Sequence, residues 1–513
     1  MRFLGTTTLR GVQLMKRLLT AAMAAALAFT ITQVPAQAEG EGGVVRTDKG
    51  AVRGTVTDTY RTFGNIPFAA APVGANRWRD PQPAAPWQGV RDATRPAPVC
   101  AQTAQLGQPG SETEDCLYLN VTTPATAPKK PRPVMVWIHG GGFTGGGASL
   151  YDARQLATRN DAVVVTVNYR LGVFGYFGHP GLPGSGAFGL ADQQAALRWV
   201  QRNARAFGGN PGNVTIFGES AGGLSVCAQL ASPRAAGLFA KAIIQSGPCG
   251  LVSPSFTEPG KFTHVWKSRT DVEKQGTGTL GCADVACLRA KPVAELLTVH
   301  EQFASPAFDT AVMPVDPVVA QRTGRLHRVP TMIGSTHDEF TLFAALIWAQ
   351  PLPEAGYRAQ VAGLFGQAPA DRIVARYPVN GNDDARDELA RLLTDASWAC
   401  PTDTARKEIG RHTRVSGYEF ADPDAPLIFP GLPPFPDYGA YHASELLSLF
   451  EFPGVQLTPA QRRLSDYMIT AWGRFARTGD PGWRPDVQSL APGAIGGTDF
   501  AREHQCGFWS SIL

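Results

Sequence analysis

The chain has 513 residues, of which 43% are hydrophobic and 18% are charged, so it can bury a large core and a folded globular protein is expected. Its 47 basic and 43 acidic residues include four basic and no acidic ones within residues 1–38, which leaves residues 39–513 formally neutral. This balance excludes functions that depend on a strongly basic surface, such as nucleic-acid binding or attachment to an anionic membrane.

The first 38 residues have the pattern of an export signal. Lys16 and Arg17 form a positive region, and an alanine-rich apolar stretch follows at residues 18–34. Small residues lead up to Ala38. We therefore expect a signal peptide at residues 1–38, cleaved after Ala38, and a secreted protein.

Two alternatives concern the same segment. Met15 lies directly before the positive residues and would start a signal of more usual length, and the apolar stretch could instead remain as a membrane anchor. No later apolar run approaches the length of about 20 residues that spans a bilayer, so no stable membrane anchor is expected. Residues 39–513 are expected to form one domain.

Short β-branched runs alternate with helical patterns along the chain. After a surface loop expected at residues 123–133, buried strands are expected at Val134–Ile138, Ala162–Val167, Val214–Phe217, Ala242–Ile244 and Thr331–Ile333, and helices at Ala191–Arg205 and Ala221–Leu230. Buried strands separated by helices predict an α/β protein with a central, mostly parallel sheet and helices on both faces. Residues 252–325 and 340–412 lack this rhythm and are expected to be inserted helices and loops that cap the carboxyl edge of the sheet, with a disordered linker as the weaker alternative.

The segment Gly218-Glu219-Ser220-Ala221-Gly222 joins an expected strand to an expected helix. A serine hydroxyl is a poor nucleophile unless it is exposed and has a base beside it. A sharp strand-to-helix turn holds the hydroxyl above the sheet edge, and the glycines relieve crowding. A chance match in a glycine-rich chain is the alternative, but the flanking strand and helix favour Ser220 as a nucleophile.

A second glycine-rich segment, His139-Gly140-Gly141-Gly142-Phe143, follows the expected strand that ends at Ile138. Glycines let a backbone approach closely and point several N–H groups at one oxyanion. The residue after the nucleophile donates a further N–H group. The expected oxyanion hole is therefore Gly141, Gly142 and Ala221, with a flexible turn as the alternative.

The base must be one of nine histidines. In α/β-hydrolases the chain order is nucleophile, acid and then histidine, which favours histidines well after Ser220. His442 lies where a loop turns into a helix, His412 precedes an expected strand, and His504 lies in the C-terminal tail. Position favours His442 without excluding the others.

The acid must orient the histidine and stabilise its charged form. Asp338 and Glu339 both follow the expected strand Thr331–Ile333, and spacing does not separate them. His337 is too close to both in sequence to be an independent partner.

Eight cysteines in an exported chain allow disulfides, but sequence alone does not fix their pairing. Cys100 with Cys116, and Cys282 with Cys287, each close a short polar segment, and Cys400 with Cys506 could hold the C-terminus. Cys227 lies in an apolar helical pattern and is expected to be a small buried hydrophobic residue, and Cys249 is unassigned. No group of His and Cys has zinc-site spacing, so no metal is expected.

Taken together, these segments resemble the type-B carboxylesterase family, which includes the cholinesterases and bacterial esterases. The stretch from Phe207 to Gly222 fits the long serine signature of that family, and Glu114-Asp115-Cys116-Leu117-Tyr118-Leu119-Asn120-Val121 fits its second signature. The likeness runs from about Gly50 to Trp509.

The resemblance implies an α/β-hydrolase fold and settles several open choices. It implies Glu339 as the acid, His442 as the base, and an oxyanion hole at Gly141, Gly142 and Ala221. It further implies Glu219 as a supporting acid, Ser246 as a residue behind the catalytic groups, and the disulfides Cys100–Cys116, Cys282–Cys287 and Cys400–Cys506.

Two departures limit what can be carried over. The acid is usually followed by glycine, whereas Phe340 stands there in this chain. The loop from Cys100 to Cys116 contains no tryptophan, and in cholinesterases the corresponding loop carries a tryptophan that holds the choline cation. A choline-specific site is therefore not expected.

The expected function is hydrolysis of small or medium carboxylic esters through an acyl-enzyme, without a metal or organic cofactor. The expected partner is a small-molecule ester, and the oligomeric state is left open. A lipase acting on long-chain acylglycerols is one alternative. A non-catalytic binding protein on the same fold is the other, although such proteins typically lack a member of the triad.

Overall fold

The computed structural model describes residues 43–512 apart from residues 256–257, 259, 380 and 382–383. The expected signal peptide, its cleavage after Ala38 and the alternative start at Met15 lie outside the described residues. No helix in the described part of the chain is long and apolar enough to cross a membrane.

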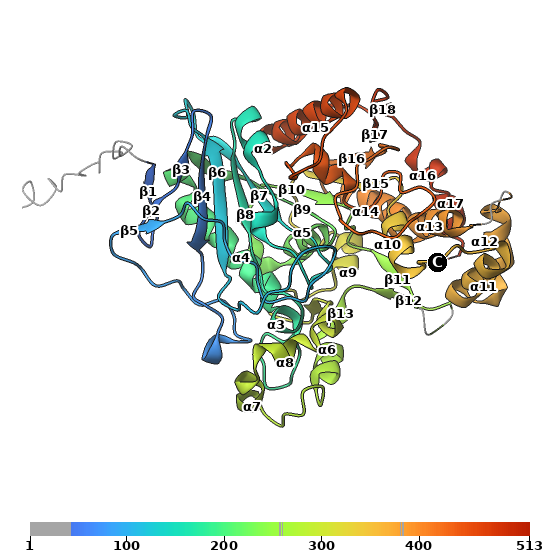
Figure 1. The fold of residues 1–513 in the computed structure, drawn as a ribbon, viewed down its shortest axis with the longest axis horizontal. Coiled ribbons are helices and arrows are strands. Elements are labelled where there is room, and N and C mark those ends of the chain that lie inside the picture. Colours follow the sequence, from blue (N-terminus) through green and yellow to red (C-terminus); the bar gives the residue numbers. More distant parts are fainter. Residues whose placement is uncertain (1–42, 256–257, 259, 380, 382–383, 513) are drawn as a thin grey trace, which may run out of the picture. The chain divides into compact units, whose positions relative to one another are not determined.

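Eleven strands of the described chain form one large sheet (Figure 1). Its order is β18-β17-β16-β15-β10-β9-β7-β8-β6-β4-β3. The seven strands from β17 to β8 are parallel, and the strands outside them pair antiparallel. The strands are β3 (Thr55–Val56), β4 (Tyr60–Pro67), β6 (Tyr118–Pro124), β7 (Arg132–Ile138), β8 (Val163–Val167), β9 (Gly209–Glu219), β10 (Lys241–Gln245), β15 (Thr331–Thr336), β16 (Val415–Phe420), β17 (Val487–Leu490) and β18 (Gly496–Gly497).

Smaller sheets are formed by β1 (Val44–Arg46), β2 (Ala51–Arg53) and β5 (Val90–Asp92), by β11 (Val252–Pro254) with β12 (Phe262–His264), and by β13 (Lys267–Ser268) with β14 (Ala307–Phe308). The α-helices are α2 (Arg154–Arg159), α3 (Gly172–Tyr176), α4 (Phe188–Asn203), α5 (Ala221–Ala231), α6 (Arg269–Gly276), α7 (Val285–Ala290), α8 (Val293–Leu297), α9 (Pro317–Thr323), α10 (Phe340–Ile347), α11 (Glu354–Phe365), α12 (Gln367–Arg376), α13 (Arg386–Thr394), α14 (Cys400–Gly410), α15 (Pro459–Thr478), α16 (Phe500–Glu503) and α17 (Cys506–Trp509).

Helices cover both faces of the large sheet because its central strands are apolar on both sides. In β7, Val134 and Val136 belong to the core that includes residues of α4 and α5, whereas Met135 and Trp137 belong to the core that includes α2 and α15. Successive side chains of a strand point to opposite faces, so one strand contributes to both cores. The expected mostly parallel sheet with helices on both faces is confirmed.

The expected surface loop at residues 123–133 is shorter than predicted. Residues 123–124 end β6 and residues 132–133 begin β7. Arg132 is buried because its guanidinium donates to Asp161 at 2.6 Å and to the carbonyl oxygen of Thr126 at 2.6 Å. These bonds let a charged residue start a central strand, which composition alone did not indicate.

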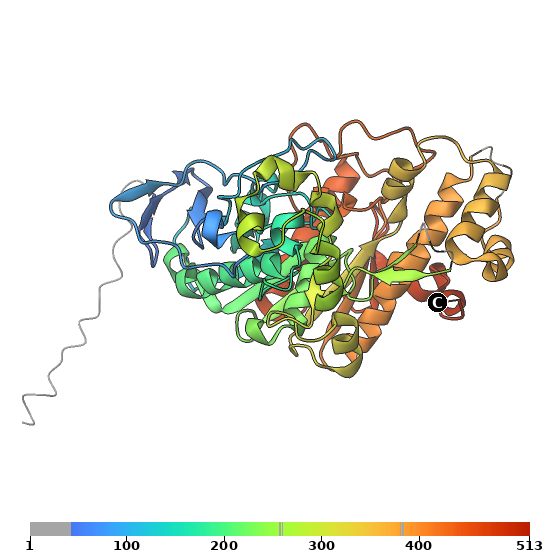
Figure 2. The ribbon, with the colours of Figure 1, turned by 90° about the horizontal axis from the view of Figure 1, so that it is seen from below.

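The two segments without strand–helix rhythm are inserted between sheet strands, and they carry helices α6–α9 and α10–α14. The first leaves the sheet after β10 and the second after β15, each at a carboxyl end. The second insert builds a core of its own that includes Leu364, Leu389 and, from the C-terminal helix, Trp509. Figure 2 shows the orange helices of this insert beside the red C-terminal helices.

Four disulfides link cysteines of the described chain, and no described cysteine is free. Three are the pairs that the resemblance implies: Cys100–Cys116, Cys282–Cys287 and Cys400–Cys506. The expectation for Cys227 was wrong: it is buried within α5, but its sulfur is bonded to Cys249, which follows β10. An apolar helical pattern indicates that a residue is buried, but it does not identify the residue that contacts it.

Candidate active site

Ser220 occupies a sharp turn between β9, which ends at Glu219, and α5, which begins at Ala221. Its backbone has a φ of 56° and a ψ of −123°, and the residue is half-buried. A Cβ atom on Gly218 would lie 2.5 Å from the carbonyl oxygen of Ile138, and one on Gly222 would lie 2.0 Å from the same oxygen. Both glycines are therefore required by the end of β7, which passes against the turn.

His442 and Glu339 are joined by a hydrogen bond. The Nδ1 atom of His442 lies 2.5 Å from Oε2 of Glu339, and both side chains are buried. The other oxygen of Glu339 accepts from the backbone N–H of Thr336 at 3.0 Å. The carboxylate therefore fixes the tautomer and orientation of the imidazole.

The other acid and base candidates lie elsewhere. Asp338 accepts from the backbone N–H of Ala440 at 2.9 Å and contacts Nδ1 of His337, also at 2.9 Å. The ring of His504 lies between Asp395 and Glu419. Phe340, at the position usually held by glycine, is buried at the start of α10, and its N–H donates to the hydroxyl of Thr394 at 2.9 Å.

Glu219 approaches the second nitrogen of His442. Its Oε1 lies 3.1 Å from Nε2 of His442, and it is buried. Burial raises the pKa of Glu219 to about 7, an effect that the nearby imidazole opposes and the charge of Glu339 reinforces. Burial by itself lowers the pKa of His442, but the charges of Glu219 and Glu339 outweigh it and raise the pKa to about 9.

The hydroxyl of Ser220 forms no hydrogen bond within the described residues, so the structure does not join it to His442 directly. The residue before Ser220, Glu219, is the one whose side chain approaches His442. Since catalytic hydrogen bonds are often long or absent without substrate, this arrangement is compatible with transfer of a proton from Ser220 to His442.

The backbone N–H groups of Gly141, Gly142 and Ala221 have no acceptor within the described chain. Gly141 and Gly142 have φ values of +100° and +60° and are exposed. A Cβ atom on Gly140 would lie 3.1 Å from Cβ of Ser220, so this loop passes directly beside the nucleophile turn. Unpaired donors at this place can bind a developing oxyanion.

The glycine loop is held from both sides. The Nδ1–H group of His139 donates to the carbonyl oxygen of Gly140 at 2.8 Å, and burial lowers the pKa of His139 to about 4, so its ring is neutral. Gln102, within the loop closed by the Cys100–Cys116 disulfide, exchanges two hydrogen bonds of 2.9 Å with the backbone of Gly146.

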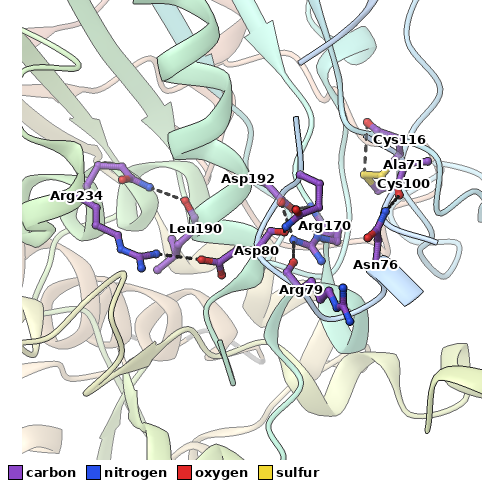
Figure 3. Close-up of polar contacts among 12 residues, drawn as sticks. Ala71, Asn76, Arg79, Asp80, Cys100, Cys116, Arg170, Leu190, Asp192 and Arg234 are labelled. Carbon is purple, nitrogen blue, oxygen red and sulfur yellow. Dashed lines mark hydrogen bonds and ion pairs between the residues drawn. A yellow bond between two sulfur atoms is a disulfide. The ribbon is translucent and has the colours of Figure 1, made fainter. Parts of the chain in front are cut away.

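The segment that follows β8 supports the same loop. The hydroxyl of Tyr169 donates to the carbonyl oxygen of His139 at 2.8 Å. Arg170 is buried and pairs with the buried Asp192 of α4 at 2.7 Å, and it also donates to the carbonyl oxygen of Arg79 at 2.8 Å (Figure 3). The bond from Tyr169 holds the start of the glycine loop, and the backbone N–H of Gly172 donates to the carbonyl oxygen of Phe143 at its end, at 2.7 Å.

A third buried carboxylate belongs to the site and was missed by the sequence analysis. Glu445, three residues after His442, accepts from Nε2 of Gln245 at 3.2 Å. Trp472 donates in turn to Oε1 of Gln245 at 3.0 Å. Burial, with the charges of Glu219 and Glu339, raises the pKa of Glu445 to about 8. Its close spacing from His442 was the one signal that could have indicated it.

Aromatic rings line the other side of His442. The ring of Phe343 lies 4.9 Å from the imidazole and that of Trp398 lies 5.7 Å from it, measured between centroids. The indole N–H of Trp398 donates to the carbonyl oxygen of Ser246 at 3.0 Å. Ser246 is buried with a φ of 48°, and its hydroxyl has no hydrogen-bond partner in the part of the chain that the structure describes.

The chain is similar to known carboxylesterases in both sequence and structure. The sequence profile described as "Carboxylesterase family" matches residues 41–491. Liver carboxylesterase 1F of Rattus norvegicus is 34% identical over 513 aligned residues, covering 86% of this chain and 87% of that protein. The para-nitrobenzyl esterase of Bacillus subtilis (strain 168) is 34% identical, covering 85% and 90%. A solved structure of a PNB esterase superposes with a TM-score of 0.74 at 30% identity, covering 91% of this chain and 99% of the other.

Proposed function

This chain belongs to the carboxylesterase family, has the α/β-hydrolase fold and is a carboxylic ester hydrolase, and we propose that it cleaves small or medium esters through an acyl-enzyme on Ser220. The observation that carries the proposal is the hydrogen bond between His442 and Glu339 beside the turn that bears Ser220. An imidazole oriented by a buried carboxylate is what a serine hydroxyl needs to become nucleophilic.

In the proposed first half-reaction, Nε2 of His442 takes the hydroxyl proton while Oγ of Ser220 attacks the ester carbonyl. Glu339 stabilises the imidazolium, and the N–H groups of Gly141, Gly142 and Ala221 bind the negative oxygen. The C–O bond to the alcohol then breaks, and the alcohol leaves with the proton from His442.

In the second half-reaction, water takes the place of the alcohol. His442 accepts a proton from the water as its oxygen attacks the acyl carbon, and the proton passes to Oγ of Ser220 when the carboxylic acid is released. Apart from the ester and water, each step uses only groups of this chain. Glu219 acts through its charge, which stabilises the imidazolium.

The aromatic side of the site supports a restricted substrate size. Phe343 and Trp398 stack with ring centroids 5.2 Å apart and both face His442, which limits the room for a bulky group next to Ser220. The loop between Cys100 and Cys116 offers no tryptophan for a quaternary ammonium group. We therefore propose uncharged esters with short or medium acyl chains.

The decisive experiment compares Ser220→Ala with the wild-type protein on a panel of nitrophenyl esters of increasing acyl length, together with an emulsified long-chain acylglycerol. We expect at least a 10³-fold loss of turnover, on the order of what loss of a triad member causes. A fluorophosphonate should label the wild-type protein and not the variant. Retained turnover or labelling of Ser220→Ala would contradict the assignment, and faster hydrolysis of the emulsion would favour a lipase.

We also propose that residues 1–38 are removed during export and that residues 39–513 form one catalytic domain. The four disulfides of the described chain support an oxidising destination. Sequencing the N-terminus of the protein recovered from the medium of a secreting host should give Glu39 as the first residue.

A further inference from the structure

Two histidines and a glutamate meet near the carboxyl ends of β15 and β16, outside the proposed catalytic groups. One potential ligand atom from each of His337, Glu419 and His504 lies within 4.8 Å of the other two. His337 follows β15, Glu419 lies in β16, and His504 follows α16. The cluster therefore joins two neighbouring strands to the C-terminal tail.

An aspartate holds the Nδ1 atom of each imidazole. His504 Nδ1 lies 2.6 Å from Oδ1 of Asp395, and His337 Nδ1 lies 2.9 Å from Oδ1 of Asp338. Since each Nδ1–H group is used by a carboxylate, Nε2 is the nitrogen left to act as a ligand. Metal-binding histidines are oriented in this way, with the second ring nitrogen donating to a carboxylate.

The cluster also has an excess of negative charge. Within the described residues, the ion pairs of Asp338, Asp395 and Glu419 are all with these two histidines. Three carboxylates thus surround two imidazoles, and a divalent cation would add positive charge to this group.

We propose that His337, Glu419 and His504 form a binding site for one divalent transition-metal ion, best suited to Zn²⁺. Two imidazoles and one carboxylate are a ligand set that Zn²⁺ accepts, with water in the fourth position. The ion replaces the proton between Nε2 of His504 and Oε1 of Glu419, which lie 2.6 Å apart, and this proton passes to solvent.

Access and fit are compatible with this exchange. The side chain of His337 is 43% exposed, so an ion can reach the cluster from solvent. Bonds of about 2.1 Å in a tetrahedral site separate the ligand atoms by about 3.4 Å. His337 therefore has to move inward, and Nε2 of His504 and Oε1 of Glu419, now 2.6 Å apart, have to separate by about 0.8 Å. The exposed position of His337 makes its movement possible, whereas His504 and Glu419 are buried and have to shift only slightly.

Zn²⁺ at this place links His337, which follows β15 and lies two residues before Glu339, to β16 and to the C-terminal tail. Cys506 ties this tail to Cys400. The expected effect is on stability, because a ligand that binds only the folded state raises the free energy of unfolding. The site does not depend on the proposed reaction, and its failure would leave the esterase assignment unchanged.

The test is a calorimetric titration of the mature, chelator-treated protein with Zn²⁺, with Co²⁺ absorption as a second probe. We expect one ion per chain, release of a proton, visible bands of four-coordinate Co²⁺, and a higher melting temperature with Zn²⁺. His337→Asn should weaken binding by at least 10-fold, on the order of the losses seen around metal sites. His264→Asn, which removes an exposed histidine elsewhere, is the matched control and should bind as the wild type does.

Glu419→Gln supplies a second variant that removes the carboxylate ligand and keeps its shape. It should lose the Co²⁺ bands while retaining the circular dichroism of the fold. No stoichiometric uptake by the wild-type protein, or equal binding by His337→Asn and His264→Asn, would overturn the proposal and leave the cluster as an ion pair that holds the C-terminus.

Discussion

The Oε1 atom of Glu219 lies 3.1 Å from Nε2 of His442, the nitrogen that does not contact Glu339. The imidazole is therefore placed between two buried carboxylates, one on each nitrogen. Its protonated form is stabilised by both, and a general base must lose that proton before it can accept another.

Removing the charge of Glu219 should make His442 easier to deprotonate. Because Glu219 raises the pKa of His442, the change Glu219→Gln lowers that pKa, and the acid limb of kcat/KM against pH moves to lower pH. Glu219→Asp keeps the charge and serves as the control. Profiles measured between about pH 5 and pH 10 that have the same acid limb in wild type and Glu219→Gln would contradict this role.

Two glycines near Ser220 should respond differently to alanine. A Cβ atom on Gly222 would lie 2.0 Å from a backbone oxygen, so Gly222→Ala should lower the free energy of unfolding by about 3 kcal/mol or more. A Cβ atom on Gly142 would have its nearest neighbour at 3.7 Å. Gly142→Ala should therefore lower the free energy of unfolding by only about 1 kcal/mol, because of the positive φ at this position. Denaturant unfolding of both variants checks the order, and equal losses would speak against the close approach of β7.

The disulfides should differ in how much they stabilise the protein. A cross-link removes conformational entropy from the unfolded chain, and the amount grows with the logarithm of the number of residues in the loop that it closes. The sequence separation is 106 for Cys400–Cys506 and 5 for Cys282–Cys287, which predicts losses of about 5 and about 2 kcal/mol when each pair is replaced by alanine. Thermal unfolding of the two double variants should show this order, and the reverse order would refute the account.

Phe343 should limit the size of the ester. Replacing it with alanine opens space beside His442, so kcat/KM for long-acyl esters should rise relative to short-acyl esters by about 10-fold. Leu346→Ala changes an exposed residue of the same helix and is the control. A ratio that is unchanged in Phe343→Ala would place the acyl group elsewhere.

Much of the arrangement could be predicted from the sequence because short segments carry it. The β-branched runs predicted the central strands, because a strand that is buried on both faces consists mostly of apolar, β-branched residues. The turn at Ser220 and the loop at Gly141 were predictable because glycine is needed where backbones approach closely. The structure brings Glu339 rather than Asp338 to His442, a choice that residue spacing alone left open.

The parts that escaped prediction depend on contacts between distant segments. The bond between Cys227 and Cys249 joins a helix to a loop after the next strand, and periodicity reports only that Cys227 is buried. Glu445 is buried because Gln245 and Trp472 complete its surroundings from other elements. The sequence around a single carboxylate gives no sign of such partners.

The backbone of Ser220 has consequences for attempts to make this enzyme withstand heat. A φ of 56° is favourable for glycine and unfavourable for serine, so the residue proposed as the nucleophile also has a strained backbone. Selection for heat resistance alone would favour glycine there, which would stabilise the fold but remove the proposed nucleophile. Substitutions intended to raise the stability of the protein are therefore better placed far from Ser220, so that its backbone conformation is kept.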